Sequence, residues 1–256
     1  MFLQSKPAVN FSAMQSVLRL TYHEYVNRKI FIVSVALYSL AILVLIFESG
    51  KKPDYLIHPY FLSFLFYFSL ISLLLSGFDI VPKMIENGSV ELILSRPITR
   101  ARLLTYNYIS TIVIIPIGTF FFFLFISFIY FVKSGFYDFV HMRVFAFTFI
   151  AFAVYAASFL PASLLFYRSN VNLLLCMVFI ASNAIPNLMY WLTAGNGEID
   201  SNYIMGLLYL LSPRLVELCG FAVKPGAGAG ITYTHSVLFI SGCLLSSYAI
   251  MNHRDF

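Results

Sequence analysis

Residues 103–132 read LLTYNYISTIVIIPIGTFFFFLFISFIYFV, thirty positions without an aspartate, glutamate, lysine or arginine. A helix needs about 20 apolar residues to cross the hydrocarbon core of a bilayer, so this stretch is long enough for a complete span. A transmembrane barrel strand would instead alternate apolar and polar residues over about ten positions. Because the stretch is apolar at successive positions, it predicts a membrane-spanning α-helix.

Five further stretches lack all four charged residue types: 30–47, 55–78, 144–167, 169–197 and 225–253. We therefore expect one all-α transmembrane domain over residues 1–256. Its six transmembrane helices should lie at about 30–47, 57–78, 106–132, 144–166, 171–192 and 231–251. The composition agrees, because 60% of the residues are hydrophobic and 11% are charged, against about 25% charged in soluble proteins. This composition excludes a soluble enzyme.

The N-terminal segment 1–29 differs from the spans, because its apolar residues recur every three or four positions. These residues are Phe11, Met14, Val17, Leu18, Tyr22 and Tyr25. The spacing predicts an amphipathic helix over 11–29 that lies along the membrane surface before the first span. A helical extension of the first span is the alternative interpretation. The segment lacks the basic start and short apolar core of a signal peptide, so we expect no cleaved signal.

The charges between the spans predict the orientation of the chain. With a cytoplasmic N-terminus, the inner side has ten lysines and arginines and five acids, while the outer side has six of each. The formal net charge of +5 then lies on the cytoplasmic side, where positive loops of membrane proteins usually lie. We expect a multi-pass protein of the cytoplasmic (inner) membrane with both termini in the cytoplasm. Because orientation explains the basic excess, nucleic acid is not an expected partner.

The cytoplasmic connection between the second and third spans, 79–105, predicts a short amphipathic helix. Gly88 interrupts the chain, Ser89 can cap a helix, and Glu91 falls in its first turn, where the helix dipole favours an acid. Arg96 precedes Pro97 and is therefore pushed out of helical geometry, so the helix should end just before it. The result is a short, stiff helix held between two spans and facing the cytoplasm.

Other residues predict where helices begin or break, and the outer loop between the last two spans predicts a further short helix. We expect Thr99 to cap a helix that runs into the third span, and Pro116 and Pro161 to kink or break their spans. The outer loop 193–230 contains an apolar run, 203–211, that is too short to cross the membrane and predicts an interfacial or re-entrant helix. Asn172 in the fifth span either bonds helices together, the commoner use, or lines a path.

Signals for chemistry on this chain are missing. The six charge-free runs count against a proton-coupled or sodium-coupled carrier, because an ionisable residue at membrane depth usually marks such a pathway. We interpret the five histidines (His23, His58, His141, His235 and His253) as surface or interfacial, since no metalloprotease or nucleophile motif accompanies them. Cys176, Cys219 and Cys243 form no metal motif. We expect no enzyme activity, cofactor or metal on this chain, and without a Walker A motif any ATP and Mg²⁺ must be bound by a partner.

The segment 84–104, MIENGSVELILSRPITRARLL, resembles the ABC-2 type permeases, which are membrane subunits of ATP-binding-cassette exporters. The matching positions are Glu86, Gly88, Ser89, Glu91, Leu92, Leu94, Ser95, Arg96, Pro97, Ile98, Thr99 and Arg100. Six spans, an N-terminal interfacial helix and an outer insertion before the last span also fit that family. The chain is most similar to its small single-domain members, including some that serve copper-enzyme maturation, although its Met, Cys and His residues form no copper-like cluster.

The resemblance implies that the helix between the second and third spans is a coupling helix, which docks on a separate ATPase subunit. The implied contact residues are Glu86, Gly88, Ser89, Glu91, Leu94, Arg96, Pro97 and Arg100. A second contact, at the turn containing Arg168 and Asn170, is implied by layout. The resemblance further implies a homodimer, or a heterodimer with a paralogous permease, that exports its substrate. Charge-free, aromatic-rich spans favour a hydrophobic or amphiphilic substrate.

Three other functions remain open at this point. A membrane scaffold could use the same helix to recruit a cytoplasmic protein without any transport. A secondary carrier would transport without an ATPase and would use an ion gradient. An intramembrane enzyme is the least supported, because no nucleophile and base, or metal ligands, occur at matching depth.

Overall fold

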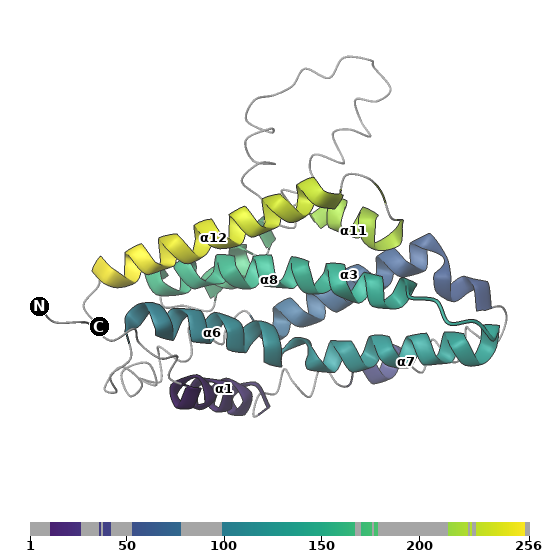
Figure 1. Cartoon of the computed structure of the whole chain (residues 1–256), viewed down its shortest axis with the longest axis horizontal. Coiled ribbons are helices and arrows are strands. Elements are labelled where there is room, and N and C mark those ends of the chain that lie inside the picture. Colours follow the sequence, from purple (N-terminus) through teal and green to yellow (C-terminus); the bar gives the residue numbers. More distant parts are fainter. Residues whose placement is uncertain are drawn as a thin grey trace, which may run out of the picture.

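The computed structural model describes residues 11–26, 36, 38–41, 53–77, 99–166, 170–175, 177–178, 215–224, 226 and 229–253. Every regular element within these ranges is helical (Figure 1). The α-helices are α1 (Phe11–Val26), α3 (Pro59–Gly77), α6 (Arg100–Ile114), α7 (Pro116–Ser134), α8 (Val140–Phe166), α11 (Leu215–Val223) and α12 (Ala229–His253). A short 3-10 helix, η1 (Pro53–Ile57), precedes α3. This part of the chain is therefore all-α, as the sequence predicts.

Four helices in the described ranges are long and apolar enough to cross a membrane: Pro59–Gly77, Ala101–Ser134, Val140–Phe166 and Ala229–His253. They correspond to the predicted spans at 57–78, 106–132, 144–166 and 231–251. The predicted spans at 30–47 and 171–192 lie largely outside the described residues. Several apolar helices of spanning length make this chain a membrane protein.

The third predicted span consists of two helices joined end to end. Helix α6 ends at Ile114 and α7 begins at Pro116, whose ring nitrogen has no proton to donate to the helical ladder. The amide of Ile115 still donates to the carbonyl of Thr111 at 3.3 Å, which keeps the helical path nearly continuous. Pro116 thus marks a helix boundary, as predicted, whereas Pro161 lies inside α8, whose helix continues through it.

Helix α8 lies at the centre of the bundle and packs against α3, α6, α7, α11 and α12 (Figure 1). Its alanines Ala151 and Ala157 are fully buried, because small side chains let neighbouring helices approach closely. At the end of α3, a Cβ atom on Gly77 would lie 3.1 Å from Cδ1 of Ile115 and 3.3 Å from the ring of Phe152. The α3 terminus therefore presses against both the α6–α7 junction and the middle of α8.

Local backbone conformation and hydrogen bonds mark where α7 ends and where α8 begins. Gly135, with φ of 72°, ends α7 in the left-handed conformation and donates its amide to the carbonyl of Phe131 at 2.9 Å. The carboxylate of Asp138 accepts a hydrogen bond from the amide of Val140, the first residue of α8, at 3.0 Å. Thr99 stands at the N-cap of α6, as predicted, but its side chain makes no capping hydrogen bond.

Mutations at the starts of α8 and α6 should have unequal effects on the free energy of unfolding. Replacing Asp138 with alanine should lower the free energy of unfolding by about 1 kcal/mol, because an amide at the start of α8 loses its acceptor. Replacing Thr99 with alanine should change it by less than about 0.5 kcal/mol, because no capping bond is lost. Unfolding of the purified protein in mixed detergent micelles would measure both. Equal losses in the two variants would contradict this account of the helix starts.

Candidate functional site

The predicted coupling segment is only partly within the described residues. Seven of its proposed ATPase-contact residues lie outside them: Glu86, Gly88, Ser89, Glu91, Leu94, Arg96 and Pro97. Arg168, in the second predicted contact, also lies outside them. Arg100 is the first residue of α6, and Asn170 is an exposed residue of a helical stretch over 170–175. The described residues therefore include the two helices that flank the segment, α3 and α6.

The predicted N-terminal helix is present as α1 and packs against α6 (Figure 1). Val17 and Thr21 are fully buried and Tyr25 nearly so, and their spacing of four places them on one face of α1. Gln15, Arg19, Tyr22 and His23 are exposed on the other face. The helix is amphipathic, but the prediction was wrong for Tyr22, which it placed on the apolar face and which is exposed. The buried face lies against protein, and this partner could not be identified from the sequence.

A tyrosine hydroxyl also joins α1 to the end of α3. Burial raises the pKa of Tyr25, and a hydrogen bond with the Ser76 side chain acts in the opposite direction. Ser76 lies one residue before the end of α3, close to where the predicted coupling segment begins. Helix α1 therefore contacts both helices that flank this segment.

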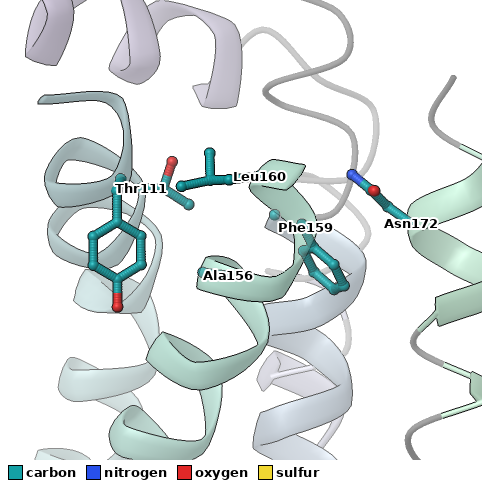
Figure 2. Close-up of a pocket in the computed structure, with 7 residues that line it drawn as sticks. Thr111, Ala156, Phe159, Leu160 and Asn172 are labelled. Atoms are coloured by element: carbon teal, nitrogen blue, oxygen red, sulfur yellow. The ribbon is translucent and has the colours of Figure 1, made fainter. Parts of the chain in front are cut away.

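A small cavity lies between α3, α6, α8 and the stretch 170–175 (Figure 2). It is lined by Gly77, Tyr108, Thr111, Ala156, Phe159, Leu160 and Asn172. Its volume of about 10 Å³ is enough for about one water molecule. Drug-sized ligands occupy pockets of roughly 300–1,000 Å³, so this cavity is far too small for an amphiphilic substrate.

Polar side chains around the cavity bond helices together. The hydroxyl of Tyr108 on α6 donates to the carbonyl of Ala153 on α8 at 3.0 Å. The amide nitrogen of Asn172 donates to the hydroxyl of Ser163 on α8 at 2.8 Å, and Figure 2 shows this amide pointing toward α8. Of the two interpretations of Asn172, the geometry favours the one in which it bonds helices together.

At the opposite end of the bundle, a buried histidine joins η1 to α8. The Nε2 atom of His141 lies 3.1 Å from the carbonyl oxygen of Leu56, and the side chain is fully buried. The prediction that all five histidines are surface or interfacial is therefore wrong for His141. Its sequence neighbours suit a span end, but the packing of η1 over the start of α8 covers the ring.

The outer connection contains a helix that the sequence analysis did not predict, α11. The run 203–211 lies outside the described residues, whereas α11 spans Leu215–Val223 and packs against α3, α8 and α12. Its buried residues Leu215, Leu218, Cys219 and Ala222 have the helical spacing i, i+3, i+4 and i+7. This spacing after Ser212 and Pro213 was the available signal, and the prediction missed it because the run of nine residues is short.

Arg143 and Glu217 place charged groups against the ends of α11. Arg143, in the first turn of α8, donates from Nε to the carbonyl of Ala222 at 3.0 Å and from Nη2 to that of Val223 at 2.9 Å. Glu217, in the first turn of α11, accepts a hydrogen bond from the hydroxyl of Thr232 on α12. Across the described ranges, no three His, Cys, Asp or Glu side chains gather closely enough to hold a metal ion.

In comparisons with known proteins, no family model and no curated protein matches the sequence.

Proposed function

We propose that this chain is the membrane subunit of an ABC-2 type exporter and couples to a separate ATPase subunit. The observation that carries the proposal is the position of the motif 84–104. Helix α3 ends at Gly77 and α6 begins at Arg100, and both belong to candidate spans. The Gly-Ser-Val-Glu and Arg-Pro residues of the motif thus lie in the connection between two spans, where a docking helix can move both.

The packing around this connection supports a coupling role. Helix α1 contacts α6 and reaches Ser76 of α3 through Tyr25, so the flanking helices are tied together. Helix α6 in turn packs against α8 and α12. Packed helices transmit rigid-body movement, because their interfaces are dense and resist local deformation. A displacement of the connection would therefore reach the centre of the bundle.

The exposed surface of the spans supports an assembly in the membrane. On α7, the side chains of Phe121 and Phe128 are more than half exposed, and on α12 those of Leu238 and Leu245 are. Such apolar surfaces face lipid or a second permease chain. In this proposal two permease chains, identical or paralogous, bind two ATPases at the cytoplasmic membrane, with both termini in the cytoplasm. They export a hydrophobic or amphiphilic molecule, and ATP and Mg²⁺ are bound by the partner.

Purification of the tagged protein in mild detergent from its native host tests this proposal. We expect a soluble ATPase to co-purify in stoichiometric amount, and a chain with Glu91→Lys and Arg96→Glu to lose it because the charged rim of the contact is reversed. A chain with Lys51→Glu and Lys52→Glu, changed on the predicted outer side, should retain it. Equal elution volumes of the three proteins in size-exclusion chromatography would show that folding is unaffected.

The other outcomes point to the other functions. Absence of any ATPase from the intact permease would contradict the proposal and favour a secondary carrier. An ATPase that binds, but whose ATP turnover never responds to transported substrates, would favour a scaffold.

A further inference from the structure

A buried imidazole links η1 to α8 at the end of the bundle where α7 ends and α8 begins. His141 lies in the first turn of α8, and its side chain is fully buried. Its Nε2 atom lies 3.1 Å from the carbonyl oxygen of Leu56 on η1. A carbonyl oxygen can only accept a hydrogen bond, so Nε2 must carry the single proton of the neutral ring. That proton is therefore already used to bind η1.

The other ring nitrogen of His141 is buried without a hydrogen bond. Nδ1 is closed off from solvent, and no partner for it occurs among the described residues. In the neutral ring Nδ1 is an acceptor, and a second proton would make it a charged donor with nothing to receive its hydrogen bond. Burial of an unpaired charge costs far more than burial of a neutral polar atom. The packed arrangement therefore requires the neutral ring.

Two titratable side chains lie close to this ring. The ring of Tyr130 on α7 packs against that of His141 with centroids 5.7 Å apart, and a tyrosine is uncharged at neutral pH. The charge of Asp138, in the turn before α8, also acts on the imidazole. This carboxylate is half-buried and already accepts the amide of Val140. A partly solvated carboxylate that is used elsewhere repays only part of the cost of burying an imidazolium.

Other charged or titratable groups of the elements that meet here are directed elsewhere. Asp54, His58 and Lys133 are exposed. The guanidinium of Arg143 binds two carbonyl groups of α11, and the carboxylate of Glu217 on α11 accepts a hydroxyl of α12. Within the described part of the chain, none of them is therefore bonded to the ring.

We propose that His141 is a pH-sensitive fastening, which holds η1 over the start of α8 while its ring is neutral and releases η1 when Nδ1 takes a proton from water. This switch does not depend on the exporter function, since it needs no partner chain. The released form binds one proton more than the closed form, so acid favours it. Below the ordinary imidazole pKa of about 6.5, the released population rises up to about tenfold for each pH unit. In the orientation proposed above, the external pH acts on it.

Release of η1 is a small movement that would expose the ring to water. This element has five residues, and its Leu56 side chain is almost fully buried, whereas Asp54 and Tyr55 are exposed. Short segments with little buried surface open at a much lower free energy than the core of a protein. The start of α8, in contrast, is held against α11 through Arg143. We therefore expect η1, and not α8, to move.

Hydrogen–deuterium exchange over residues 53–62 measures this release. The amide of His58 donates to the carbonyl of Tyr55 within η1 at 3.2 Å. A segment of five residues does not stay helical by itself, so this bond is lost when η1 leaves the bundle. Division of the exchange rate of the denatured chain by the observed rate, at the same pH, gives a protection factor. The pH dependence of the exchange chemistry cancels in this ratio.

In the full chain in liposomes, the protection factor should fall about tenfold between pH 7.5 and pH 5.5. In His141→Gln it should stay constant, because the glutamine amide can donate to the Leu56 carbonyl but takes up no proton in this range. His58→Gln is the matched control, since it removes an exposed histidine beside η1. Its protection should fall as in the parent.

A protection factor that is the same at both pH values in the parent, or that falls equally in His141→Gln, overturns the proposal. So does a factor that rises in acid, because the charged ring would then be held by Asp138. A comparable fall over residues 236–247 of α12 would show that the whole bundle unfolds, which also overturns a local switch. If His141→Gln lacks protection already at pH 7.5, His58→Gln decides the question. A fall that persists in it supports the buried ring, and one that vanishes overturns the proposal.

Discussion

A chain in which Gly77 is replaced with leucine is expected to lose about 3 kcal/mol of its free energy of unfolding, the upper end of the usual cost of overpacking. A Cβ at this position already lies 3.1 Å from Cδ1 of Ile115 and 3.3 Å from the ring of Phe152. The three further carbon atoms of leucine would have to separate α3 from both the α6–α7 junction and α8. Unfolding in mixed detergent micelles measures the loss, and the yield of monodisperse protein should fall with it.

Gly118 on α7 offers a matched control, because a Cβ there meets no atom within 4 Å. Gly118→Leu should raise the free energy of unfolding by up to about 1 kcal/mol, since leucine favours the helix over glycine and its Cβ meets no neighbouring atom there. Both glycines are helical, so they differ mainly in their surroundings. If the two variants lose equal stability, the close approach of α3 to α8 is not the reason that position 77 requires glycine.

A single change of Glu91 to lysine is expected to weaken binding of the proposed ATPase by about thirtyfold and to reduce export accordingly. Reversal of one charge in a docking contact leaves its partner unpaired and costs about 2 kcal/mol or more, and 1.4 kcal/mol corresponds to a factor of ten. The affinity of the purified ATPase for the permease in liposomes measures the effect. Substrate-stimulated ATP turnover in the same liposomes measures its consequence.

Glu198→Lys is the matched control for Glu91→Lys, because it makes the same change in the segment predicted to lie outside. It should leave ATPase affinity and turnover unchanged. Normal expression and unfolding of both variants would show that only the contact is altered. Full affinity and turnover in Glu91→Lys would remove the docking role from this residue and leave the segment as a connector between spans.

The features that the sequence determined by itself are those with a local physical cause. The charge-free runs at 55–78, 103–132, 144–167 and 225–253 are confirmed as helices of spanning length, because lack of charge and apolar length decide membrane insertion residue by residue. The boundary at Pro116 follows from its missing amide proton, and the start of α6 after Thr99 was likewise predicted. The residues of the docking motif remain predictions, since all but Arg100 of its proposed contacts lie outside the described residues.

The tertiary structure alone decided which faces meet. The sequence showed that α1 is amphipathic, and only packing showed that Val17 and Thr21 lie against protein. His141 looked like a residue at a span end, and η1 buries it. No partner for Arg143 or Glu217 was evident from the sequence, and the packing of α11 against α8 and α12 gave each of them a partner on another helix. Each of these outcomes depends on contacts between residues far apart in the chain, and such contacts leave no periodic signal in the sequence around any one of them.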